Sequence, residues 1–129
     1  MKLTTEINEA NFESEVLKSS RPVLVEFATE WSLPSMRLDG ALEELASEFV
    51  DYLRVAHVQL ERSPNLGLWY GIRSLPTMLY FVDGEVSIGI FGATSKEAIL
   101  SQLKPAINSR RESDFTSLGR FGAPSGLSV

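Results

Sequence analysis

Two serines, Ser32 and Ser35, stand where a buried run of the chain, Val23 to Ala28, gives way to a helical pattern that continues to about Val50. A strand that feeds a tight turn at a helix N-terminus brings backbone N–H donors and the positive end of the helix dipole together, which stabilises anions, thiolates included. Serine hydroxyls stay protonated at neutral pH. The segment that begins at Trp31 therefore predicts a site with suitable dipoles but without a side chain that ionises there.

The chain also contains the residue types of a serine hydrolase triad, because His57 is its one histidine and Glu26 is an acid within an apolar run. A triad needs nucleophile, base and orienting acid within hydrogen-bond reach of one another. Residue types without that geometry are weak evidence, and no nucleophile-elbow motif is present. Ser32 is more simply interpreted as a helix cap or as the remnant of another site.

Composition narrows the possible partners. The chain has 129 residues, of which 43% are hydrophobic, and a net charge of -5. This length suits one domain with its own core, and the negative charge argues against nucleic acid or an anionic membrane as the main partner. No apolar run reaches the ~20 residues of a membrane span, and the first residues lack the apolar region of a signal peptide, which predicts a cytoplasmic protein.

Cysteine and histidine usage excludes several kinds of site. With no cysteine there is no disulfide, thiol nucleophile, cysteine-bound zinc or iron–sulfur cluster, and one histidine offers little to a transition metal. We therefore expect no metal and no cofactor.

The elements that must position these residues follow from periodicity and from turn residues. The expected strands are Thr4 to Ile7, Val23 to Ala28, Leu53 to Leu60, Met78 to Val82 and Val86 to Phe91. Four helices are expected. The first runs from Glu9 to Lys18 and is capped by Asn8, and the second follows the Trp31 turn and continues to about Val50. The third runs from Ser63-Pro64 to about Tyr70, and the last is capped by Ser95 and ends near Ile107. Their order predicts an α/β fold in which helices cover both faces of a central mixed β-sheet.

Turn residues and prolines predict where these strands and helices end. Asp83-Gly84 predicts a hairpin between the last two strands, and Pro105 should shorten or kink the final helix. Residues 1–107 are expected to form the domain. The Ser-, Gly- and Arg-rich residues 108–129 are expected to be a disordered tail, with partner binding through its few apolar side chains as the less common alternative.

Several separated pieces of the chain resemble the thioredoxin family over about Leu3 to Ile107. They are Val23-Leu24-Val25-Glu26-Phe27, Trp31-Ser32-Leu33-Pro34-Ser35 where the family has Trp-Cys-Gly-Pro-Cys, Tyr70-Gly71-Ile72-Arg73-Ser74-Leu75-Pro76-Thr77, Asp83-Gly84-Glu85 and Phe91-Gly92-Ala93. The resemblance implies the thioredoxin fold. In that family one cysteine attacks a substrate disulfide and the second resolves the mixed disulfide, whereas serine neither ionises near neutral pH nor forms a disulfide.

Other family features carry over by resemblance. Pro76 matches the family's cis-proline, and the backbone of Leu75 would pair with an extended substrate. The resemblance implies an apolar groove for a peptide or protein partner, formed by Trp31, Leu33, Pro34, Leu60, Leu75, Pro76, Gly92 and Ala93. Leu33 replaces the usual glycine and enlarges this apolar surface, and Met36 replaces the usual basic residue.

Glu26 falls at the family's buried acid, and His57 falls where a lysine often lies near it. We expect the two side chains to approach one another on adjacent strands. A buried, unpaired carboxylate is costly, so either pairing or neutralisation should follow.

Two smaller expectations concern side chains outside this site. Trp69 and Tyr70 are expected to pack the short helix against the sheet. The acidic residues Asp39, Glu43, Glu44 and Glu48 are expected to form a solvated helix face.

The sequence thus favours a thioredoxin-like binding module without redox activity, chaperone-like or engaged in assembly, that acts on extended peptides or on a protein partner. The alternative is a Cys-to-Ser form of an active protein-disulfide reductase of cell redox homeostasis. A third possibility is a structural subunit that uses the fold only for assembly. The oligomeric state does not follow from the sequence.

Overall fold

The computed structural model describes residues 3–31, 38–93 and 95–119, with 108–119 described by their backbone alone. The strands are β1 (Thr5–Ile7), β2 (Val23–Ala28), β3 (Arg54–Gln59), β4 (Thr77–Val82) and β5 (Glu85–Phe91). The helices are η1 (Glu13–Leu17), α2 (Asp39–Glu48), α3 (Pro64–Trp69) and α4 (Lys96–Gly119). The predicted order of strands and helices is therefore confirmed.

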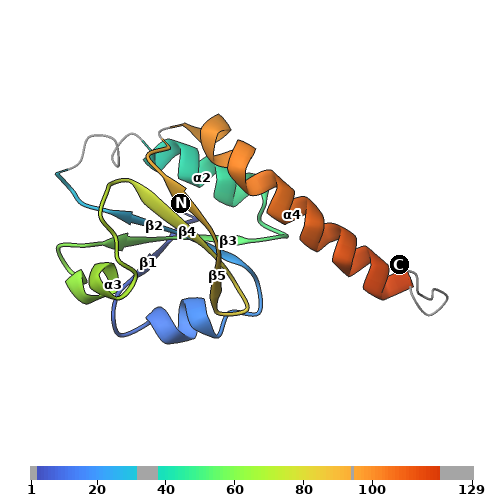
Figure 1. Cartoon of the computed structure of the whole chain (residues 1–129), viewed down its shortest axis with the longest axis horizontal. Coiled ribbons are helices and arrows are strands. Elements are labelled where there is room, and N and C mark those ends of the chain that lie inside the picture. The colour runs from blue at the N-terminus through green and yellow to red at the C-terminus, as the bar shows by residue number, and fades with distance from the viewer. Residues whose placement is uncertain (1–2, 32–37, 94, 120–129) are drawn as a thin grey trace.

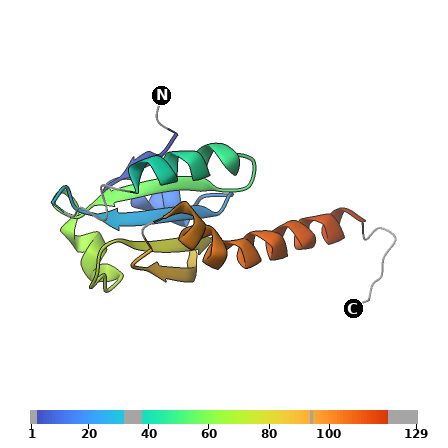
Figure 2. The ribbon, with the colours of Figure 1, turned by 90° about the horizontal axis from the view of Figure 1, so that it is seen from above.

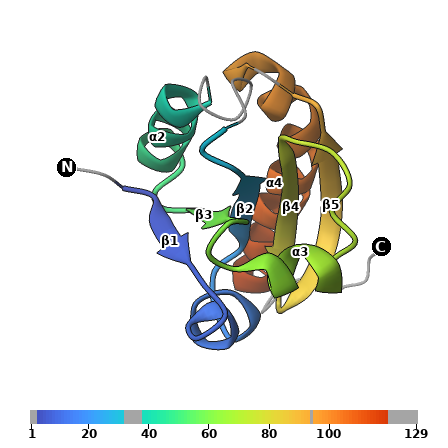
Figure 3. The same cartoon turned by 90° about the vertical axis from the view of Figure 1, so that its left-hand side faces the viewer.

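The five strands form one mixed sheet in the order β1-β3-β2-β4-β5, which Figure 3 shows from one edge to the other. β3 pairs in parallel with both β1 and β2, whereas β4 pairs antiparallel with β2 and β5. The α/β fold class expected from the sequence is correct. β2 lies in the middle of this order, and all six of its residues are buried.

Two hydrophobic clusters, one on each face of the sheet, hold the helices. Because side chains alternate along a strand, Leu24 joins α2 and α4 in one cluster, while Val25 and Phe27 join η1 and α3 in the other. In Figure 1, α2 and α4 lie above the sheet and η1 and α3 below it. An unalternated apolar strand is what burial on both faces requires.

Local capping follows the sequence fully at only one of the three predicted positions, because Asn8 caps the turn before η1, whose own N-cap is Phe12. Asn8 Oδ1 accepts hydrogen bonds from the backbone N–H groups of Ala10 (2.8 Å) and Asn11 (2.9 Å), and Ser95 Oγ accepts one from the N–H of Ala98 (3.1 Å). Ser63 precedes α3 as predicted but makes no capping bond with its side chain, and it is buried instead. The sequence therefore predicted where α3 begins, but the capping hydrogen bond expected from the Ser63 side chain is not formed.

α4 is longer than the sequence predicted. It continues through Pro105 to Gly119, so Pro105 does not end it, and residues 108–119 are helical where a disordered tail was expected. The segment between Pro105 and Gly119 has no further proline or glycine and includes good helix formers such as arginine and glutamate. Figure 2 shows this helix extending beyond the rest of the fold.

Within the described part of the chain, no helix combines the length and apolar character that crossing a bilayer requires.

The hairpin between β4 and β5 turns at Asp83 and Gly84, which have φ angles of 53° and 82°. Both residues lie in the left-handed region, as a two-residue hairpin loop favours. A Cβ atom added to Gly84 would stand 2.7 Å from the carbonyl oxygen of Leu17. Glycine is therefore required here both by the backbone conformation and by the close approach of Leu17, the last residue of η1.

Replacing Gly84 by alanine should lower the free energy of unfolding by roughly 2 to 3 kcal/mol, because left-handed strain and a backbone contact act together. Gly71→Ala is the matched control. Gly71 has a φ of 63° with no atom within 4 Å of an added Cβ, so only the strain of roughly 1 kcal/mol remains. Chemical denaturation of both variants measures the difference. Equal losses would show that the Leu17 contact contributes nothing.

Candidate functional site

The candidate binding residues gather at one edge of the sheet because of how the strands are paired. Ala28, at the end of β2, lies beside Gln59, at the end of the parallel strand β3. Thr77, at the start of the antiparallel strand β4, pairs with both Phe27 and Phe91. Four segments therefore leave or enter the sheet at the same edge, and they carry Trp31, Leu60, Leu75-Pro76 and Gly92-Ala93.

The Leu75–Pro76 peptide bond is cis, as the sequence predicted. The N–H of Gly92 donates a hydrogen bond of 3.0 Å to the carbonyl oxygen of Pro76, and Gly92 has a φ of 74°. This bond ties the segment before β4 to the segment after β5. Leu75 precedes the first residue pair of β4, so its backbone lies outside the described strand ladder.

Exposure differs among the predicted surface residues. Trp31 is 83% exposed, Leu60 and Leu75 are half-buried, and Pro76 and Ala93 are buried. A single exposed apolar side chain is common on a protein surface, so Trp31 indicates a binding surface only together with its neighbours at this end of the sheet. The remaining members of the predicted site, Ser32, Leu33, Pro34 and Ser35, lie outside the described residues, as does Met36.

Glu26 and His57 lie on adjacent strands, directly opposite one another in the β2–β3 register. Both side chains project from the face of the sheet that α2 and α4 cover, because Leu24 and Val55, two residues earlier on each strand, belong to the cluster on that face. Glu26 is only 2% exposed, and its Oε2 atom has no hydrogen-bond partner.

Burial, and to a smaller extent the nearby carboxylate of Asp39, together raise the pKa of Glu26 from 4.5 to about 7. Desolvation disfavours the charged form of a carboxyl group, and so does a second negative charge. Of pairing and neutralisation, the two outcomes expected from the sequence, these causes favour neutralisation at and below neutral pH.

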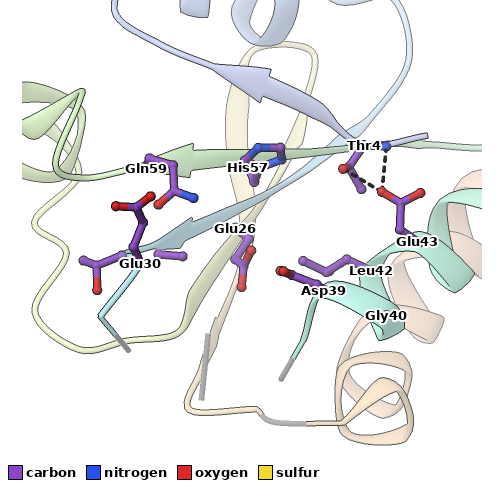
Figure 4. A pocket seen from close by; sticks show the side chains of 11 residues that line it. Thr4, Glu26, Glu30, Asp39, Gly40, Leu42, Glu43, His57 and Gln59 are labelled. Atoms are coloured by element: carbon purple, nitrogen blue, oxygen red, sulfur yellow. Dashed lines mark hydrogen bonds between the residues drawn. The ribbon is translucent and has the colours of Figure 1, made fainter. Parts of the chain in front are cut away.

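Asp39 is the residue of this site that the sequence did not reveal. It opens α2 and was assigned to a solvated helix face, yet its side chain points toward Glu26 across a hollow of about 450 Å³ (Figure 4). The helical spacing in the sequence groups Asp39 with the other acids of the exposed face of α2. Only the packing of α2 on the sheet brings it close to Glu26. The described residues that line this hollow are Thr4, Glu26, Ala28, Thr29, Glu30, Asp39, Gly40, Leu42, Glu43, His57 and Gln59.

A second member of the acidic helix face is also engaged. Glu43 accepts hydrogen bonds from the N–H of Leu3 (2.7 Å) and from the N–H (3.3 Å) and hydroxyl (2.8 Å) of Thr4. Figure 4 shows the bonds to Thr4 at the rim of the hollow. Glu43 therefore fastens the segment before β1 to α2, so the acidic face is not simply solvated.

The two aromatic residues at the end of α3 behave differently from one another. Tyr70 packs as predicted, with its ring 5.6 Å from that of Phe12 and 5.4 Å from that of Phe81. Trp69 does not, because it is 63% exposed. The prediction that Trp69 packs against the sheet was wrong, since Leu66 and Gly67 supply the buried side of this short helix.

Comparison with known proteins supplies the deciding observation. The family model described as Thioredoxin matches residues 3–105, which include every described residue of the site. The chain belongs to the thioredoxin family.

Among its relatives is a protein named Thioredoxin from Acidithiobacillus ferridurans, 41% identical over 97 residues that cover 75% of this chain and 90% of that protein. Thioredoxin 1 of Synechococcus elongatus is 34% identical over 103 residues, covering 80% and 96%. Thioredoxin of Rhodospirillum rubrum is 33% identical over 102 residues, covering 79% and 98%. Against this family background, the absence of any cysteine from the chain is its main departure.

Among the described residues, no three His, Asp or Glu side chains are grouped so that they could hold a metal ion. The expectation that the site works without a metal or cofactor stays a prediction. What the described side chains offer is an exposed indole, a fixed cis-proline and a buried acid.

The raised pKa of Glu26 predicts a pH-dependent stability. Below pH 4.5 the carboxyl group is protonated in the folded and unfolded chain alike, and between 4.5 and about 7 only the unfolded chain ionises, so stability is lost as the pH rises through this window. Glu26→Gln should remove this loss, so the variant gains about 3 kcal/mol relative to the unchanged protein between pH 4.5 and 8.

Denaturant unfolding across this pH range measures that gain. Glu85→Gln, at an exposed acid on β5, is the matched control and should run parallel to the unchanged protein. If the stability of Glu26→Gln also changed with pH as that of the unchanged protein does, the raised pKa of Glu26 would be contradicted.

Proposed function

We propose that this thioredoxin-family protein is a binding module without redox activity, which holds an extended peptide segment or a protein partner on the surface around Trp31 and Pro76. The observation that carries the proposal is an 83% exposed Trp31 at the same sheet edge as a cis-proline, in a chain without cysteine. Dithiol exchange needs two thiols, whereas binding an extended chain needs none.

The expected mode of binding is strand addition. Leu75 lies just outside the β4 ladder, so its backbone groups are placed to pair with an extended chain, and the hydrogen bond from Gly92 to Pro76 holds this segment in position. A tryptophan side chain buries roughly 150 Å² or more in an interface, worth on the order of 4 kcal/mol before the cost of association is subtracted. Trp31 is therefore the expected energetic anchor.

The alternative is a Cys-to-Ser form of an active protein-disulfide reductase, and it is supported by relatives named thioredoxin, one of them 41% identical. The two proposals differ in what the protein as it stands should do. A binding module should capture partners and show no disulfide turnover, whereas an inactivated enzyme should become active when Ser32 and Ser35 are both replaced by cysteine.

Replacing Trp31 by alanine should weaken peptide binding at least tenfold, because the anchor side chain is lost, while changing the free energy of unfolding by less than about 0.5 kcal/mol. Trp69→Ala is the matched control, since Trp69 is also exposed (63%) but lies on α3. Calorimetric titration with extended peptides selected against the unchanged protein measures both variants. Equal weakening by the two substitutions would contradict a specific role for Trp31.

The absence of redox activity is tested separately by reduction of insulin disulfides. The unchanged protein should show no turnover above the reductant alone, because no thiolate is available. Turnover that requires the protein would refute this part of the proposal. In the same assay, strong activity of Ser32→Cys/Ser35→Cys together with a failure to find any peptide ligand would favour the inactivated reductase.

A further inference from the structure

The hollow between α2 and the sheet has no assigned role. It measures about 450 Å³, and its described lining comes from the segment before β1, from the ends of β2 and β3 and from α2. Trp31, Leu75 and Pro76 are not among these lining residues. In its described lining the hollow therefore shares no residue with the surface proposed to bind peptides, and it offers a ligand different chemistry.

Two buried acceptor atoms belong to side chains that line the hollow and lack hydrogen-bond partners. They are Oε2 of Glu26 and Oε1 of Gln59. They lie on the neighbouring strands β2 and β3, on the same face, since Ala28 pairs with Gln59 and Glu26 with His57. Leaving a buried acceptor without a donor costs about 1 to 3 kcal/mol, so a ligand that donates to both atoms recovers this cost.

The charge of the lining points to a cation. Among the described lining residues are four carboxyl groups and neither lysine nor arginine. Glu43 is already engaged by Leu3 and Thr4, which leaves Glu26, Glu30 and Asp39 to face a ligand. The described lining thus offers a ligand negative charge and acceptor atoms.

We propose that this hollow binds a small alkylammonium ion, whose N–H groups donate to Glu26 Oε2 and Gln59 Oε1 while the carboxylate of Asp39 supplies the opposing charge. An ammonium group carries three donors and no acceptor, which matches separate acceptors on two strands and one helix. The apolar side chains of Ala28 and Leu42 in the lining suit an alkyl stem. A metal ion is the poorer match, because the described residues hold no group of three ligating side chains.

Binding of this cation is coupled to protonation. The titratable groups that face Glu26 are His57 on β3, Asp39 and Glu43 on α2, and Glu30 beyond β2. Because an ammonium ion favours the ionised carboxylate, its binding releases a proton from Glu26 when the pH is below about 7. The affinity for the amine should therefore rise with pH between 6 and 8.

Isothermal titration of the full chain with 1,4-diaminobutane tests the proposal, with 1,4-butanediol as the uncharged analogue. Saturable binding of the diamine and none of the diol is expected. Glu26→Gln should weaken the diamine at least tenfold and remove the pH dependence, whereas Glu85→Gln, the same substitution at an exposed site, should leave both unchanged. Equal binding to Glu26→Gln and Glu85→Gln, or equal binding of diamine and diol, would overturn the proposal.

A second variant tests the proposed amine site even if Glu26→Gln fails to fold. Asp39→Asn alters an exposed side chain and should weaken the diamine several-fold, while the variant still unfolds in one cooperative transition in the absence of ligand. Peptide binding through Trp31 should be the same in the presence and absence of the diamine. An Asp39→Asn variant that binds the diamine as the unchanged protein does would contradict the role given to its charge.

Discussion

Strand β2 must be buried on both faces and still carry an ionisable group, and much of the structure follows from that constraint. All six residues of β2 are buried, between α2 and α4 on one side and η1 and α3 on the other. Within it, Glu26 is only 2% exposed, so its charge is disfavoured by burial and also by the nearby carboxylate of Asp39. The strand thus lies at the centre of the sheet order, and its burial gives the carboxyl group of Glu26 a pKa of about 7.

The same strand separates two regions with different chemistry. Its C-terminal end leads to Trp31, at the sheet edge where the cis Leu75–Pro76 bond and Gly92 meet. Its interior residue Glu26 faces the hollow under α2. The described side chains at this edge are apolar, from exposed Trp31 to buried Pro76, whereas the described lining of the hollow is acidic. The chain has no cysteine, so neither region offers thiol chemistry.

The sequence predicted those features that depend on local pattern. The apolar run of β2, the Asp83-Gly84 hairpin and the capping bond of Ser95 are all as expected, because each depends on residues close together in the chain. The acidic hollow was not predicted, since Asp39 reaches Glu26 only through the packing of α2 on the sheet. The length of α4 was missed because Pro105 suggests an end where the helix continues.

The central claim is that the edge around Trp31 and Pro76 binds an extended chain without electron transfer. It is tested most directly by titrating the isotope-labelled protein with an unlabelled extended peptide that contains no cysteine, and following the backbone amide resonances. The account predicts saturable shifts concentrated at Trp31, Leu75 and Gly92, with residues of α4 unchanged. Shifts confined to α4 or to the β5 edge, or binding that appears only after cysteines are introduced at positions 32 and 35, would contradict it.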